Sequence, residues 1–130
     1  MAALSNYAEK LLLDWSMTTG SATRPTAWYV GLFTAAPSDS GGGTEVSGSG
    51  YSRQAVTFGA ASSPGGTTSN TGAVSFTASG GSWGTVSHIG IFDNSSGGNL
   101  LWHGSMTASK SVADGDTLEF SIGNIDLTLA

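Results

Sequence analysis

The sequence predicts a mainly β fold: an antiparallel, jelly-roll-like β-sandwich of about six to seven strands or more, with one N-terminal amphipathic helix. Two observations support this prediction. Short runs rich in β-branched and aromatic residues recur along the chain, separated by turns rich in Gly, Ser and Asn. Only one segment, near the start, has apolar residues at helical spacing. The chain thus divides into an N-terminal helix, residues 1–20, and a single β-sandwich domain, residues 21–130.

The helix is expected from Leu4 to Met17. Five apolar residues recur there at helical spacing and form one stripe: Leu4, Ala8, Leu11, Leu12 and Trp15. Asn6 followed by Glu9 resembles a capping box, and Gly20 marks the end. Such a stripe either covers the chain's own sheet, which packing arguments favour, or packs on a partner subunit. For the second case, the candidate subunit contacts are Leu4, Leu11, Leu12 and Trp15.

The clearest β signal is a hairpin between Trp83 and Gly104. Its arms are the apolar runs from Thr85 to Phe92 and from Leu100 to His103, joined by a loop rich in Gly, Ser and Asn. The near-continuous apolar run from Thr26 to Thr34 predicts a second, central strand.

Other strands are predicted from shorter alternating patterns. These occupy Tyr51 to Gly59, Thr71 to Thr77 and Thr117 to Leu129, and the last changes parity at Gly123, which predicts a bulge or bend. The polar, Gly-rich residues 35–50 and 60–70 are expected to be surface connections, and Ser105 to Val112 is only weakly patterned.

Composition excludes several classes of function. The formal charge is −5 with four basic residues, which argues against nucleic acid as a partner. The chain has no cysteine, so it offers neither a disulfide nor a thiolate metal site. No apolar run approaches the roughly 20 residues that span a bilayer, and no secretory signal is visible, so membrane insertion is not expected.

Reactive residue types do not converge in the sequence. His88 and His103 lie on opposite arms of the hairpin and could face each other, but no carboxylate has a spacing that completes a metal site. Asp93, Asp114 and Asp116 could ligate calcium, although D-G-D is first a turn signal. No nucleophile elbow or pair of catalytic acids is evident. We therefore expect no catalytic, cofactor-binding or metal-binding residues.

The aromatic residues allow two interpretations. Trp28, Tyr51, Trp83 and Trp102 could line a flat face that stacks on sugars. In a sheet protein with few other large side chains they more often form the core, which is the interpretation we favour.

Four stretches, taken together and in order, carry a family resemblance: LSNYAEKLLLD at the start, WYVGLFT before a Pro-containing loop, GTEVSGSGYSRQAVTF, and WGTVSHIGIFD with NLLWHG. They resemble small virion proteins of tailed bacteriophages that are commonly labelled phage tail fibre proteins. The resemblance extends from Leu4 to Leu129. It implies a non-enzymatic structural subunit of a phage particle, with no catalytic or binding residues to carry over.

We therefore expect a non-enzymatic structural component of a bacteriophage virion, a tail-fibre or tail-tip subunit that needs no cofactor. One alternative is a capsid cement or decoration protein on the head surface, because 130 residues is short for a fibre shaft. Another is a carbohydrate-binding, receptor-binding module. The expected partners are copies of the chain itself, in a trimer or higher ring, and other virion proteins, with a host-surface glycan under the last alternative. The expected location is the virion, assembled in the cytoplasm of the bacterial host.

Overall fold

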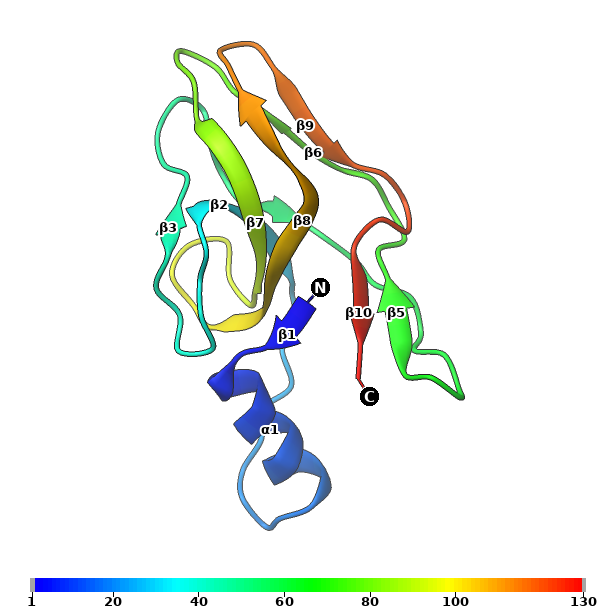
Figure 1. Cartoon of the computed structure of the whole chain (residues 1–130). Helices are drawn as coiled ribbons and strands as arrows, with labels where there is room; N and C mark the ends of the chain where they lie inside the picture. The colour runs from blue at the N-terminus through cyan, green and yellow to red at the C-terminus, as the bar shows by residue number, and fades with distance from the viewer. Residues whose placement is uncertain (1, 130) are drawn as a thin grey trace.

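The computed structural model describes residues 2–129 and shows a mainly β, antiparallel, sandwich-like fold with one helix (Figure 1). The main sheet has the strand order β1–β8–β7–β2–β3, and β4 pairs with β2 beside this path. Its strands are β1 (Ala2–Leu4), β2 (Tyr29–Ala35), β3 (Thr44–Glu45), β4 (Gln54–Ala55), β7 (Gly84–Phe92) and β8 (Leu100–Val112). Two further pairs are β5 (Thr67–Ser69) with β10 (Asp126–Thr128) and β6 (Val74–Thr77) with β9 (Thr117–Phe120). The helix α1 is Asn6–Ser16.

The predicted hairpin forms the centre of the main sheet, as β7 and β8. Ile91 lies opposite Trp102, and Gly90 lies opposite His103. β8 continues to Val112, well beyond the arm that the sequence indicated. The second half of β8 is mostly exposed and built from Ser, Thr, Ala and Lys, and its register with β7 shifts between Val86 and His88. An exposed, irregular strand has no apolar alternation to read, which explains the weak pattern.

The core lies between the main sheet and the β6–β9 pair. Its members are Val30, Leu32, Val46, Val56, Val74, Phe76, Ala78, Trp83, Val86, Ile91, Val112, Leu118, Phe120 and Ile125. Phe76 joins the layers, because its ring stacks on Tyr51 at 6.2 Å between centroids and meets Phe120 edge-on at 6.4 Å. Trp83 is buried, and its indole N–H donates to the Ser49 carbonyl at 3.0 Å. The core interpretation is thus correct for Trp83.

Four expected boundaries were wrong, three of them because strands of two or three residues leave little pattern. β3 lies inside the expected connection 35–50, and β5 lies inside the connection 60–70. Of the segment from Tyr51 to Gly59, only Gln54–Ala55 pairs as a strand. β2 begins at Tyr29, three residues later than expected.

The bend predicted at Gly123 is confirmed, and a buried asparagine holds it. Gly123 has φ of 83°, and the chain turns there between β9 and β10. Asn70 is 1% exposed. Its amide donates to the carbonyls of Gly72 (2.8 Å) and Ser121 (3.0 Å), and its side-chain oxygen accepts from the Ile125 N–H (2.9 Å). This one side chain therefore ties the end of β5 to the bend.

Gly31 on β2 leaves space for side chains that pack against the strand. Gly31 lies opposite Gly90 in the β2–β7 ladder. A Cβ added at Gly31 would lie 2.8 Å from a carboxylate oxygen of Glu45 and 3.0 Å from the Phe92 ring. Glycine is needed here for space.

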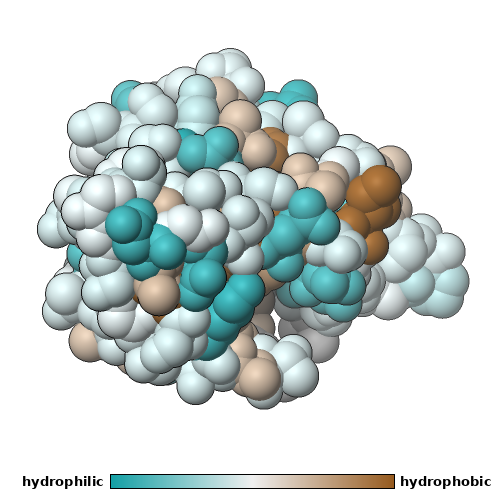
Figure 2. Space-filling view, turned by 90° about the horizontal axis from the view of Figure 1, so that it is seen from above, coloured by the Kyte–Doolittle hydropathy of each residue, from teal (hydrophilic) through white to brown (hydrophobic). Residues whose placement is uncertain are grey.

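The end of the molecule far from α1 has a mostly pale surface with scattered teal patches and little brown (Figure 2). Such a surface is expected from a chain in which charged residues make up only 10%.

Candidate assembly surface

Helix α1 begins at a serine that also fixes it to the sheet. Ser5 is the N-cap, and its hydroxyl oxygen accepts from the Ala8 N–H at 3.1 Å. The same hydroxyl donates to the Leu100 carbonyl, and the Ser5 N–H donates to the Leu101 carbonyl at 2.9 Å. The capping box predicted from Asn6 and Glu9 is therefore wrong by one residue, and Leu4 belongs to β1.

The helix does not cover the sheet, contrary to the favoured interpretation. It meets the rest of the fold at its base, where only Ala8 is buried, and then projects away from the strands (Figure 1). Trp15 on α1 is 74% exposed, and Met17, which caps the end of the helix, is 78% exposed. Large apolar side chains rarely protrude together from a single helix unless another surface covers them.

An apolar groove runs between α1 and the segment that follows it. It has a volume of about 510 Å³ and is lined by Leu11, Leu12, Trp15, Ala22, Arg24 and Pro25. Three of the four predicted contact residues thus lie together in this groove. Leu4 does not, because it pairs with Trp102 in the β1–β8 ladder. We call this surface the α1 groove.

Sequence reasoning missed the second wall of the groove. Ala22, Arg24 and Pro25 lie in a stretch without periodicity, so nothing in the pattern marked them. One available signal was Arg24 itself, because basic residues are rare in this chain.

A polar cluster holds two loops together at the β3 edge of the main sheet. The Arg53 guanidinium donates to both carboxylate oxygens of Glu45, through Nε and Nη2, each at 2.8 Å. Its Nη1 donates to the carbonyls of Asn94 (3.0 Å) and Gly97 (2.8 Å). Its guanidinium carbon lies 3.5 Å from the centre of the Phe92 ring. Arg53 therefore joins β3 to the loop that follows β7.

Tyr51 completes this cluster. Its hydroxyl donates to Glu45 at 2.6 Å and accepts from the Leu32 N–H at 2.9 Å. Burial opposes ionisation of Glu45, but the hydrogen bonds from Arg53 and Tyr51 outweigh it and hold the pKa of Glu45 below its ordinary value. Burial, followed by the Glu45 carboxylate, raises the pKa of Tyr51. Arg53 has four of its donors committed to the protein, so the cluster is built to hold loops.

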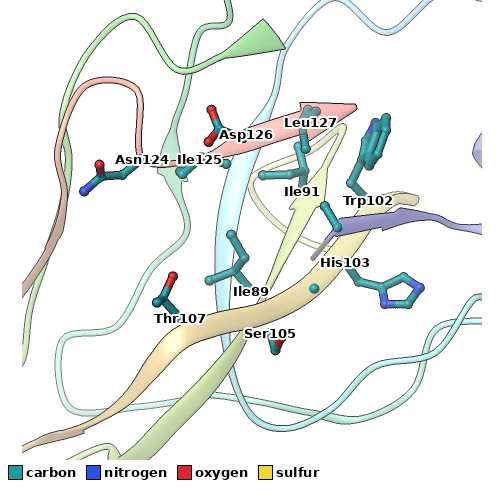
Figure 3. A pocket seen from close by; sticks show the side chains of 12 residues that line it. Ile89, Ile91, Trp102, His103, Ser105, Thr107, Asn124, Ile125, Asp126 and Leu127 are labelled. Atoms are coloured by element: carbon teal, nitrogen blue, oxygen red, sulfur yellow. The ribbon is translucent and has the colours of Figure 1, made fainter. Parts of the chain in front are cut away.

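A cleft also opens between β7–β8 and the β5–β10 pair. Two adjoining hollows, of about 240 and 280 Å³, share Ile91, Trp102 and Leu127. Trp28 lies in the second hollow, and Asn124 and Asp126 lie at the rim of the first. Figure 3 shows Trp102 beside Ile91 and Leu127, with His103 leaving β8 in another direction. We call this the Trp102 cleft.

The two histidines do not face each other directly. His88 lies opposite Ser105, and His103 lies opposite Gly90. The Nδ1 atom of His88 lies 2.8 Å from the Ser87 hydroxyl, and the Nε2 atom of His103 lies 2.8 Å from an Asp39 carboxylate oxygen. Each imidazole therefore has its own local partner.

The three aspartates weighed for calcium act as turn acceptors. Asp114 accepts from the Gly80 N–H and Asp116 from the Ala113 N–H, each at 2.9 Å, while Asp93 accepts from Asn99. Asp93 follows one end of β7, and the other two lie beyond the opposite end, where Gly84 pairs with Val112. Within residues 2–129, no group of three or more His, Asp or Glu side chains is arranged to hold a metal ion.

Helix α1 has 11 residues. In the part of the chain that the structure describes, no helix has both the length and the apolar character needed to cross a membrane.

Comparison with known proteins gives one family. The family model described as "Podophage GP4 fiber I protein gp80" matches residues 3–128, which is almost the whole chain. No curated protein matches the sequence. The match covers both α1 and every strand from β2 to β10, so the resemblance stated from the sequence is confirmed. The chain belongs to the podophage fibre family of gp80, and it is a structural component of a phage virion.

Proposed function

We propose that this protein is a non-enzymatic tail-fibre subunit that assembles with copies of itself through the α1 groove. The observation that carries the proposal is the exposure of Trp15, 74%, on a helix that projects from the sheet. The family description, a fibre protein, supports the tail over the head surface as its location. The capsid cement alternative has no separate support in the fold.

The energetic argument rests on apolar area. A largely exposed tryptophan loses about 2 to 3 kcal/mol of favourable burial relative to a buried one. Leu11 and Leu12 are only partly covered, and Ala22 and Pro25 extend the apolar surface next to them. A second protein surface seated in the groove would remove this area from water. That gain supports assembly at α1.

The absence of enzymatic activity is part of the same proposal. It is supported by the use of polar side chains: Glu45, Arg53 and Tyr51 bond to one another, and Asp39 bonds to His103. Groups committed in this way fix loops in place.

The test is sedimentation velocity over a range of concentrations, comparing the full chain with Leu12→Glu/Trp15→Glu. We expect the unaltered chain to associate and the double variant to sediment as a monomer with an unchanged far-UV circular dichroism spectrum. Leu13→Glu is the matched control, because Leu13 is 58% exposed on the same helix but does not line the groove. Association equal in all three proteins would refute the proposal. Point variants are preferable to deleting residues 1–19, because that deletion also removes β1 from the sheet.

A second candidate function, saccharide binding, is favoured by the Trp102 cleft. A partly exposed indole next to carboxylate and amide groups offers a stacking face and hydrogen bonds for a sugar ring. The side chains of Asp126 and Asn124 have no hydrogen-bond partner within residues 2–129. Of the four aromatic residues considered for sugar stacking, Trp28 and Trp102 line the cleft, whereas Trp83 is part of the core and Tyr51 bonds to Glu45.

Binding to an array of bacterial surface polysaccharides tests this second candidate. We expect Asp126→Asn to weaken any binding, and Asp114→Asn, far from the cleft, to leave it unchanged. No binding by the assembled protein, or binding that Asp126→Asn does not change, would remove the candidate.

A further inference from the structure

Three of the four cationic side chains of this chain are held by other residues: Lys10 by Asp14, Arg53 by Glu45, and Lys110 by the Thr117 carbonyl. Arg24 has no hydrogen bond or ion pair with any residue in the range 2–129. A guanidinium carries a permanent positive charge and several N–H donors in a fixed plane. Among the described residues, Arg24 is therefore the cation that stays available to a ligand.

Arg24 lies in the second hollow of the Trp102 cleft, next to an aromatic surface. The rings that line this hollow with it are those of Trp28, Phe58 and Trp102. Each of these rings packs on the core but is only partly buried, so one part of it stays open to the cleft. A flat apolar ring gives the C–H face of a sugar ring a surface on which to stack. The second hollow thus combines a stacking surface with a cation.

The polar groups of the second hollow limit what it can bind. Thr68 and Gly59 both line it, and the Thr68 hydroxyl donates to the Gly59 carbonyl. The Thr68 oxygen can therefore accept a further hydrogen bond but has no proton left to donate. Arg24 is the charged donor in this hollow, and guanidinium groups bind planar oxyanions most strongly, through two parallel hydrogen bonds.

The adjoining hollow carries the opposite charge. Asp126 and Asn124 line it, and the Asp126 carboxylate has no hydrogen-bond partner within residues 2–129 (Figure 3). A carboxylate accepts hydrogen bonds from sugar hydroxyls but repels a second anion. A ligand that spans both hollows is therefore favoured when it is negative beside Arg24 and neutral, with free hydroxyls, beside Asp126.

The charge balance favours a carboxylate over a phosphate as the anion. A carboxylate carries a single negative charge, which one guanidinium neutralises, whereas a phosphate group on a sugar carries about −1.5 to −2. The formal charge of the chain is −5, so excess negative charge on a ligand is repelled. The hollows, of about 240 and 280 Å³, together fall in the range of ligand sites, about 300 to 1,000 Å³.

We propose that the Trp102 cleft binds an acidic saccharide, a carboxylated sugar such as a hexuronic acid linked to a neutral sugar, and that Arg24 holds its carboxylate. The acidic sugar stacks on the tryptophan surface of the second hollow, and hydroxyls of the neutral sugar donate to Asp126. The inference rests on the second candidate function, saccharide binding at this cleft. It adds the class of saccharide and the residue that selects it.

Carboxyl reduction of the saccharide tests the pairing from the ligand side. Bacterial polysaccharides that contain hexuronic acid are printed on the array in native form and after chemical reduction of each carboxyl to a primary alcohol, which leaves the linkages intact. Capsular polysaccharides and lipopolysaccharides are printed separately, because both contain acidic sugars, and carboxyl-dependent binding to either supports the proposal. Tryptophan fluorescence titration with single-repeat oligosaccharides of the bound members then gives dissociation constants that do not depend on assembly. We expect the native repeat to bind at least about tenfold more tightly than the reduced repeat.

Variants test the pairing from the protein side. Arg24→Gln should bind native and reduced repeats equally, whereas Arg24→Lys should keep part of the preference, because a point charge replaces the planar guanidinium. Lys110→Gln is the matched control, because it removes the same charge from the chain and Lys110 does not line the cleft. It should keep the full preference for the native repeat.

The outcomes separate this inference from the candidate function on which it rests. Equal binding of native and reduced repeats by the unaltered chain would overturn the acidic saccharide and leave saccharide binding standing. A preference that Arg24→Gln keeps, or that Lys110→Gln loses, would overturn the role of Arg24. Binding restricted to phosphorylated saccharides would overturn the choice of a carboxylate. No binding to any printed saccharide would overturn both the inference and the candidate function.

Discussion

Replacing Arg53 by Met should destabilise the fold without touching the α1 groove. The variant keeps an apolar stem over Phe92 but loses two hydrogen bonds to Glu45 and two to backbone carbonyls. Removing one partner of a buried ion pair costs about 3 to 5 kcal/mol, because the other charge stays buried alone. The Glu45 side chain is 26% exposed, so water recovers part of this. We expect a loss of about 3 kcal/mol, a fall of roughly 10 °C in Tm.

The effect should depend on pH with a defined sign. In the unaltered protein the pKa of Glu45 is lowered from its ordinary value of 4.5, so the stabilisation is fully present above that value. It is lost as the pH falls through the folded-state pKa. In Arg53→Met the partly buried Glu45 carboxylate keeps the Tyr51 hydrogen bond but loses its cation, so protonating Glu45 should remove part of the cost of the unpaired charge. The stability difference between the two proteins should therefore be largest near about pH 7 and should shrink at about pH 3.

Urea unfolding at both pH values, followed by tryptophan fluorescence, measures the difference. Lys110→Met is the matched control, because within residues 2–129 it removes a cation with a single hydrogen bond, to the Thr117 carbonyl, and should cost under about 1 kcal/mol. Arg53→Lys keeps the charge but cannot form the bidentate contact with Glu45. Its loss of stability should therefore lie between those of Lys110→Met and Arg53→Met. The reasoning would be refuted if Arg53→Met were as stable as the unaltered chain, or if the stability difference between these two proteins did not narrow in acid.

Three further changes test local features by thermal or urea unfolding. Ser5→Ala removes the N-cap of α1 and the hydroxyl bond to Leu100 on β8, and should cost about 1 to 2 kcal/mol with a loss of helical circular dichroism. An unchanged spectrum and stability would contradict the role of Ser5 in holding the helix. Asn70→Ala leaves one buried N–H, of Ile125, and the carbonyls of Gly72 and Ser121 without their partner, and should cost about 2 to 3 kcal/mol. Asn124→Ala should change stability by under about 0.5 kcal/mol, and equal effects of the two changes would argue against the bend being held by Asn70. Gly31→Ala forces a methyl group against the Glu45 and Phe92 side chains and should cost about 1 to 3 kcal/mol, whereas Gly72→Ala meets nothing within 4 Å and should be neutral or slightly stabilising. A tolerated Gly31→Ala would show that the Glu45 and Phe92 side chains can move aside.

The candidate surface was predicted only in part. The apolar stripe of α1 identified Leu11, Leu12 and Trp15, because helical spacing is visible in a single segment. It also included Leu4, which the structure places in β1, since a three-residue strand before a helix carries no signal of its own. Arg24 and Pro25 were missed because their place in the groove depends on how the following loop folds back.

The sequence by itself determined the fold class, the single helix, the central hairpin and the bend at Gly123. These features follow from local rules: the alternation of apolar side chains, their helical spacing, and the backbone preferences of Gly and Asn. It also determined the family, through ordered segments across nearly the whole chain.

Tertiary structure alone decided which side chains meet. Arg53 finds Glu45 eight residues away, but it also reaches Asn94 and Gly97 across the sheet edge. The direction in which α1 leaves the sheet is set by the bonds of Ser5 to Leu100 and Leu101, far along the chain. Periodicity reports which face of an element is apolar; whether that face is covered depends on contacts between distant residues, and here those contacts leave the α1 groove open.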